Sequence, residues 1–245
     1  MFRRGLIAAV AMVALLAGCA TGRGGGAAAT PTPDRSVLCR PLQGLTTQRS
    51  ADDCLTVVLA LDKALSAALA PLLPGGATVS NNTFDEHGEF GGPGIQFHRT
   101  LAEQGGERYE AAVRIKDGAN PYNLRVELVG YQQVPPQNRC AVEPAMAADR
   151  QAKGIVTVEC GQSASDGATV FRELTGFPSG SGDAAKRLTP NGVVEVYRPG
   201  GELVRVSFEA VPEKAVSGGA PGMLPMNLTM DQLVAIAKSP ALTVG

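Results

Sequence analysis

The sequence predicts an α+β fold: an antiparallel sheet of hairpins with a long N-terminal helix packed on it and a short C-terminal helix. Three observations predict it. Strand-like segments, in which apolar and polar residues alternate, come in pairs around Gly-containing turns. Two other segments have helical periodicity, and strand–helix–strand units do not recur. With 44% hydrophobic residues in 245, the chain can bury a core.

The first eighteen residues are typical of a signal peptide. Arg3 and Arg4 precede an unbroken apolar run of eleven residues, Leu6–Leu16. As a helix, this run would span about 16 Å, too short for a bilayer core of roughly 30 Å. We therefore expect residues 1–18 to be an export signal and not a permanent membrane span. The sequence leaves open whether export follows the general secretory or the twin-arginine route.

The end of this segment, Leu16-Ala17-Gly18-Cys19, resembles the lipobox of bacterial lipoproteins. The resemblance implies that the chain is cut before Cys19 and that the Cys19 thiol takes a diacylglycerol, so that acyl chains such as palmitate anchor the protein. It also implies a location at the cell membrane, on its extracytoplasmic face. The alternative is an ordinary secretory signal peptide that happens to contain a cysteine.

Residues 19–35 are predicted to be a tether. They contain Gly and Ala, which make a chain flexible, then Pro31 and Pro33, which stiffen it, and no large apolar side chain that could pack. We expect residues 36–245 to form a single globular extracytoplasmic domain. Removal of residues 1–18 takes away two arginines and no acid, so 20 basic residues face 23 acidic ones. This mild acidity gives no electrostatic reason to expect nucleic-acid binding.

Four further cysteines, Cys39, Cys54, Cys140 and Cys160, predict disulfides, because an even number of cysteines in an exported chain usually pairs. Three pairings are possible. We favour Cys39–Cys54 and Cys140–Cys160, since each closes a short loop between adjacent elements. A metal site is the rival interpretation, but it would favour closer Cys-x-x-Cys pairs or histidines near the thiols.

The first predicted helix covers about residues 51–70. Ser50 is a suitable N-cap, and Asp52 and Asp53 lie in the first turn, where the helix dipole favours anions. Apolar residues recur at spacings of three and four, which indicates an amphipathic helix, and Pro71 ends it.

Six segments are predicted to be strands because apolar and polar residues alternate in them. Their pairs are Arg108–Ile115 with Leu124–Leu128, Ile155–Cys160 with Thr169–Leu174, and Val193–Arg198 with Leu203–Ala210. The turns between them contain Asp117-Gly118, Asp166-Gly167 and Pro199-Gly200-Gly201. The charges on the first pair alternate in sign. They form either a binding face for a polar partner or, more commonly, a solvated face with cross-strand ion pairs.

The C-terminal helix is predicted from Met230 to Lys238. Thr229 and Gln232 form a capping box, Leu228 and Leu233 a hydrophobic staple, and Pro240 prevents continuation. Two patterns resemble a group of uncharacterised actinobacterial exported lipoproteins. One is Tyr197-Arg198-Pro199-Gly200-Gly201 with Val204 and Val206, and the other is Leu228-Thr229-x-x-Gln232-Leu233-x-x-Ile236-Ala237-x-x-Pro240-x-Leu242. The resemblance implies a location and assigns no catalytic residue.

The most polar stretch, residues 81–98, holds the residues of a weak candidate metal site: Asp85, His87, Glu89 and His98. Their spacing matches no helix-based zinc motif, and a Gly-rich run within the stretch favours an exposed, solvated loop between strands. No Gly-x-Ser-x-Gly in a strand–turn–helix context and no phosphate-binding loop occur in the sequence, so we expect no cofactor.

Two functions are compatible with this sequence. The first is a membrane-anchored surface lipoprotein whose domain binds another envelope protein or a small ligand without catalysis. The alternative is an extracytoplasmic hydrolase or metal-dependent enzyme centred on His87 and His98. A lipid anchor, together with a stable domain that lacks catalytic motifs, favours the first.

Overall fold

A computed structural model gives the arrangement of strands and helices. It describes residues 35–82, 94–102, 105–117, 121–130, 133–137, 139–141, 144–179, 187–211 and 222–245. The signal peptide, Cys19 and the tether up to residue 34 lie outside the described residues, as do Asp85, His87 and Glu89. The described elements belong to one compact unit, residues 34–245.

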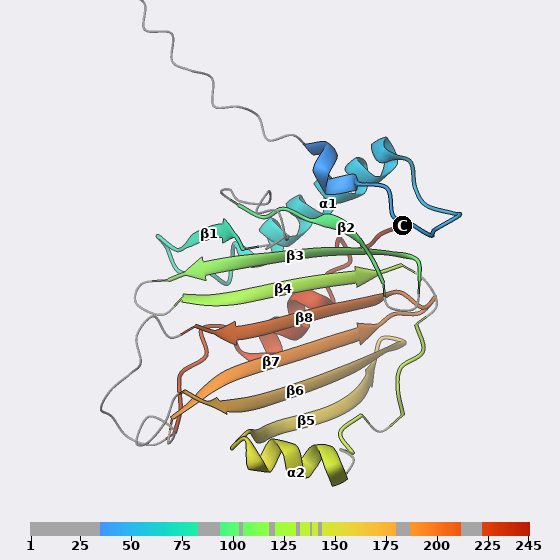
Figure 1. The fold of residues 1–245 in the computed structure, drawn as a ribbon. Coiled ribbons are helices and arrows are strands. Elements are labelled where there is room, and N and C mark those ends of the chain that lie inside the picture. Colours follow the sequence, from blue (N-terminus) through green and yellow to red (C-terminus); the bar gives the residue numbers. More distant parts are fainter. Residues whose placement is uncertain are drawn as a thin grey trace, which may run out of the picture. The chain divides into compact units, whose positions relative to one another are not determined.

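Nine strands in the described residues form one sheet (Figure 1). They are β1 (Thr78–Asn81), β2 (His98–Leu101), β3 (Glu107–Lys116), β4 (Pro121–Val129), β5 (Val156–Ser165), β6 (Ala168–Pro178), β7 (Arg187–Tyr197), β8 (Leu203–Ala210) and β9 (Gly222–Met223). The helices are a short 3₁₀ helix η1 (Arg35–Cys39), α1 (Ala51–Leu69), α2 (Pro144–Ala152) and α3 (Met230–Ala237). The predicted α+β class with an antiparallel sheet is therefore confirmed.

The strand order is β1-β3-β4-β8-β7-β6-β5, with β2 beside β3 and β9 beside β7. Every pairing is antiparallel except that of β9 with β7. The three predicted strand pairs are neighbours, whereas β4 and β8 come from distant parts of the chain. The β5–β6 turn is Asp166-Gly167, and both residues have positive φ (53° and 76°), as tight two-residue hairpin turns require.

The core lies on one face of the sheet, where α1 and α3 also contribute their apolar residues (Figure 1). Along each central strand, alternate side chains are buried there, including Tyr109, Val113, Leu124, Val126, Val194, Val206 and Phe208. The side chains between them point to the opposite face, which we call the open face. This alternation follows from the two-residue repeat of a strand and allows one face to be polar.

α1 begins where the sequence predicts it. The Ser50 hydroxyl accepts a hydrogen bond of 3.1 Å from the Asp53 N–H, so Ser50 is the N-cap. One side of the helix is buried through Cys54, Val58, Leu61, Ala64, Leu65 and Leu69. None of the helices that the structure describes is long and apolar enough to cross a membrane.

α3 has the predicted capping box. Gln232 N–H donates to the Thr229 hydroxyl at 3.2 Å, and Thr229 N–H donates to the Gln232 side chain at 2.7 Å. The helix packs closely on β7 at Gly192, where an added Cβ would lie 2.9 Å from the Met230 sulfur. A larger residue at this position would push α3 away from the sheet.

Both predicted disulfides are confirmed. Cys39–Cys54 joins η1 to α1, and Cys140–Cys160 joins the segment before α2 to β5. The helix α2, which the sequence analysis did not predict, lies beside β5 (Figure 1). Arg150 of α2 reaches the sheet, where its guanidinium lies 2.7 Å from the Glu173 carboxylate.

Several segments differ from the sequence-based prediction. β5 and β6 extend to Ser165 and Pro178, beyond the predicted ends at Cys160 and Leu174. β7 begins at Arg187, six residues before the predicted Val193, and therefore includes Pro190. The pairing of β7 with β8 covers Asn191–Tyr197, so Pro190 has no partner residue on β8. A proline is tolerated at such a position because it lacks the N–H that a central strand would need on that side. The stretch 81–98 was predicted to be an exposed loop, but Asn81 belongs to β1 and His98 is buried in β2. Pairing of both short strands with β3, which is far away in the sequence, explains the difference.

Candidate functional site

The open face of the sheet carries a row of charged residues that lie directly opposite one another on neighbouring strands. We call His98, Glu110, Glu127, Arg205 and Glu195 the charged row. The registers place His98 opposite Glu110, Glu110 opposite Glu127, Glu127 opposite Arg205, and Arg205 opposite Glu195. The row therefore crosses β2, β3, β4, β8 and β7.

Arg125 compensates the like charges of Glu110 and Glu127, which would repel each other across β3 and β4. Its guanidinium lies 2.8 Å from each carboxylate. Arg108 adds a contact of 3.1 Å to Glu110. The predicted cross-strand ion pairing is therefore present, and it holds Arg125 along the sheet, close to the charged row.

Glu195 is the most buried acid of the row, with a side chain only 3% exposed. Arg139 pairs with its carboxylate, the Tyr197 hydroxyl donates to it at 2.8 Å, and Arg205 approaches it to 3.4 Å. The Arg139 guanidinium also lies over the ring of Phe171, 4.7 Å from its centroid. Because Arg139 precedes Cys140, the Cys140–Cys160 disulfide helps to hold this cation over the sheet.

His98 is the only residue of the weak candidate metal site that the structure describes. It is 8% exposed, and its Nε2 lies 3.5 Å from a Glu110 carboxylate oxygen. Burial lowers the pKa of His98, and the neighbouring Glu110 offsets this only in part. Such burial does not favour a histidine that meets a substrate. Among the described residues, no three His, Cys, Asp or Glu side chains are placed to hold a metal ion.

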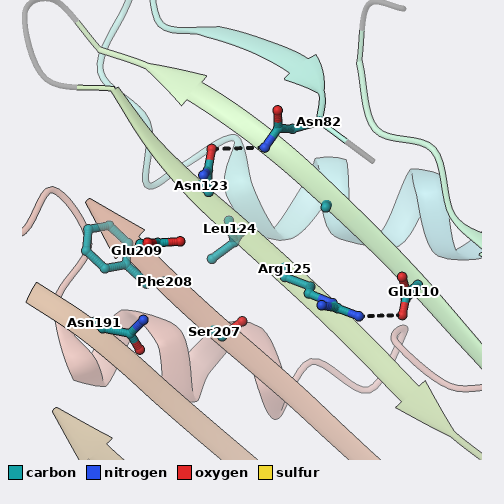
Figure 2. Close-up of a pocket in the computed structure, with 10 residues that line it drawn as sticks. Asn82, Glu110, Asn123, Leu124, Arg125, Asn191, Ser207, Phe208 and Glu209 are labelled. Atoms are coloured by element: carbon teal, nitrogen blue, oxygen red, sulfur yellow. Dashed lines mark hydrogen bonds and ion pairs between the residues drawn. The ribbon is translucent and has the colours of Figure 1, made fainter. Parts of the chain in front are cut away.

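Beside the charged row, the open face is hollowed over β3, β4, β8 and β7, with a volume of about 350 Å³ (Figure 2). We call this depression the polar hollow. Its lining side chains are Asn82, Glu110, Ala112, Asn123, Arg125, Asn191, Ser207 and Glu209, and Leu124 and Phe208 also border it. The volume lies at the lower end of the range of small-molecule sites, but the lining is more polar than that of most such sites.

Short side chains create the polar hollow. Ala112 and Ser207 are the residues on either side of Arg125 in the register of β3, β4 and β8. Since Arg125 is held by Glu110 and Glu127, it does not fill the space between these two small residues. The depression is therefore a consequence of the charged row as well as of residue size.

The polar groups of the hollow come from distant parts of the chain. Asn123 on β4 lies opposite Glu209 on β8, which in turn lies opposite Asn191 on β7. The side-chain amide of Asn82 donates a hydrogen bond of 3.1 Å to the side-chain oxygen Oδ1 of Asn123 (Figure 2). Within the described part of the chain, the side chains of Asn191, Ser207 and Glu209 form no hydrogen bond or ion pair, so they can serve a ligand.

A second hollow, of about 600 Å³, lies among Thr46, Thr47, Gln48, Arg49, Gly106, Glu107, Gly130 and Val244. The charged groups of this second hollow, Arg49 and Glu107, already form hydrogen bonds that hold the fold together. Arg49 donates to Glu107 at 3.2 Å and to the Val244 carbonyl oxygen at 2.6 Å. Burial raises the pKa of Glu107, but hydrogen bonds from Arg49, Arg99 and Tyr109 lower it below its usual value. This pattern indicates a structural network, so the polar hollow is the better candidate site.

Sequence reasoning identified the charged strands but did not identify the polar hollow. Its residues lie on four strands and one adjoining segment, and none of Asn82, Asn191 and Ser207 belongs to a recognisable motif. The alternating charges of Arg125 and Glu110 were the only signal for this face. Comparison of the chain with protein-family models, with curated proteins and with solved structures finds no match.

Proposed function

We propose that this chain is a lipid-anchored extracytoplasmic binding protein whose domain takes a small polar ligand in the polar hollow without catalysing a reaction. The observation that carries the proposal is a set of polar side chains, Asn191, Ser207 and Glu209, that have no partner among the described residues and surround a depression of about 350 Å³. This volume corresponds to about a dozen water molecules. The ligand is therefore small, on the scale of a monosaccharide or an amino acid.

The lipobox and the resemblance to actinobacterial exported lipoproteins support the anchor. Cys19 would hold the protein at the outer leaflet, and residues 20–35 would give the domain an r.m.s. reach of roughly 20–25 Å. Anchoring is tested by Cys19→Ser, with the location followed by immunoblotting of membrane and medium fractions. The variant should appear in the medium, whereas full-length protein retained in the membrane would contradict the lipobox interpretation.

Binding is tested by thermal unfolding of the purified full-length protein in a low-molecular-mass envelope extract. A ligand present at about 100 times its Kd stabilises a protein by about 2.7 kcal/mol. For a domain of this size, the expected rise in Tm is roughly 5–10 °C.

The decisive variant is Ser207→Phe, which fills the polar hollow from the open face. Ser163→Phe is the matched control, because Ser163 is an exposed residue of β5 that does not line the hollow. The extract should stabilise the wild type and the control but not Ser207→Phe. Equal stabilisation of all three proteins, or of none, would overturn the proposed binding site.

A further inference from the structure

We propose that the ligand of the polar hollow carries a protonated amine, which binds to the carboxylate of Glu209. The inference rests on the proposed function and adds the chemical class of the ligand. It depends on which charges of the lining are already compensated and which are not.

Glu110 and Arg125 compensate each other. They lie 2.8 Å apart, and each has a further partner of opposite charge on the open face. Glu209 is exposed, and within the described residues it has no ion-pair partner. The lining of the polar hollow therefore has a formal charge of −1, located at Glu209.

The neighbours of Glu209 determine what surrounds the amine. Asn123 and Asn191 lie opposite it on the two flanking strands. An amide side chain offers both donors and an acceptor, and the Ser207 hydroxyl offers one donor and two lone pairs. These groups suit hydroxyl or amide groups of a ligand, while the carboxylate of Glu209 can only accept hydrogen bonds and favours a cation.

An anionic ligand is disfavoured because Arg125, the arginine in the lining of the hollow, is already engaged, as are Arg205 and Arg139 beside it. Arg125 is shared by Glu110 and Glu127, Arg205 lies 3.4 Å from Glu195, and Arg139 also pairs with Glu195. A phosphate or carboxylate would have to displace one of these acids. Glu209, in contrast, can accept a cation without breaking any described contact.

The test uses four probes with the same sugar ring and different charges: glucose, N-acetylglucosamine, glucosamine and glucose 6-phosphate. Their Kd values are measured by NMR titration of the full-length protein at about pH 6, where the glucosamine amine is protonated. Glucosamine should bind about twofold to fivefold more tightly than the two neutral sugars, as expected for one exposed ion pair. Resonances of the polar hollow should shift, and Ser207→Phe should abolish the response.

Glu209→Gln should remove the preference for glucosamine while keeping the shape of the side chain. The control is Asp149→Asn, which removes one negative charge from α2 and should keep the preference. Three results would each overturn the amine proposal: equal affinity for the sugars, tighter binding of the phosphate, or no binding of any probe. A preference that survives in Glu209→Gln would overturn it as well.

Thermal unfolding in the envelope extract distinguishes a failure of the amine proposal from a failure of the proposed binding function. Stabilisation that is lost in Ser207→Phe but retained in full by Glu209→Gln would show that the polar hollow binds a ligand without an amine. Absence of stabilisation in the wild type would overturn both proposals. If both proposals are correct, stabilisation should be lost in Ser207→Phe, reduced in Glu209→Gln and unchanged in Asp149→Asn.

Discussion

The guanidinium of Arg198 donates a hydrogen bond of 2.6 Å to the carbonyl oxygen of Leu242. It also donates to the carbonyl oxygens of Ala237 and Ser239, at 3.2 Å and 2.7 Å, and so satisfies backbone acceptors at and beyond the end of α3. Glu202 lies 2.6 Å from the same guanidinium. The two sequence patterns singled out above, around Arg198 and around α3, are thus parts of one contact.

Arg198→Lys should destabilise the domain by about 2–4 kcal/mol, because lysine keeps the charge but cannot place a planar fork of donors against several carbonyls. Chemical denaturation provides the measurement. Arg172→Lys is the control, since Arg172 is 42% exposed and, within the described part of the chain, makes ion pairs with Glu159 and Asp231 alone. Arg172→Lys should lower the free energy of unfolding by less than about 1 kcal/mol. An equal loss of stability in the two variants would contradict the assigned role of Arg198.

Loss of the Cys39–Cys54 disulfide should destabilise the domain more than loss of Cys140–Cys160. Restriction of the unfolded chain is worth about 3 kcal/mol for each, because the cysteines are separated by similar distances, 15 and 20 residues. Cys39 and Cys54, however, are 2% and 0% exposed, so a double serine variant also places hydroxyls in the core. Denaturation midpoints of the two double serine variants would test this order, which equal or reversed losses would refute.

Glu195 and Arg139 should be strongly coupled. Glu195→Gln alone should cost about 2–4 kcal/mol, since it leaves cations facing a nearly buried neutral group. A double-mutant cycle with Arg139→Met should give a coupling energy of about 1–3 kcal/mol. The free energies of unfolding are measured with urea. If the loss in the double variant equals the sum of the losses in the two single variants, Glu195 and Arg139 are not coupled and the prediction is wrong.

The domain should lose stability as the pH falls below about 6.5, the usual pKa of histidine in an unfolded chain. Burial lowers the pKa of His98 in the folded state, so between the two pKa values the unfolded chain binds more protons. The stability conferred by neutral His98 is therefore present above this range and lost as the pH falls through it. Glu110, Arg108 and Arg125 are the charged groups that act on His98.

His98→Gln should flatten the dependence of Tm on pH between about pH 7.5 and 5.5. A wild-type Tm that stays constant over this interval, or a slope unchanged in the variant, would contradict the prediction. Asp149→Asn serves as the control, because its exposed carboxylate lies on α2 and pairs only with Lys153 in the described structure.

The local elements were predictable because their signals lie within a few residues of one another. The Ser50 cap, the Thr229 capping box and the Asp166-Gly167 turn each depend on neighbouring residues, and all three are present. β2 and the early part of β7 were not predicted. Pairing with distant strands stabilises them, although His98 lies in a polar stretch and Pro190 is a poor strand residue.

The sequence by itself determined the fold class and the strand faces and favoured the disulfide pairs, since periodicity and spacing are local properties of the chain. Only the tertiary structure decided that β4 lies beside β8, and hence that Asn123, Asn191 and Glu209 meet. Contacts between strands about 80 residues apart depend on the register of the whole sheet, which no single segment encodes. The polar hollow is therefore a property of the assembled sheet, built from residues that are unremarkable in the sequence.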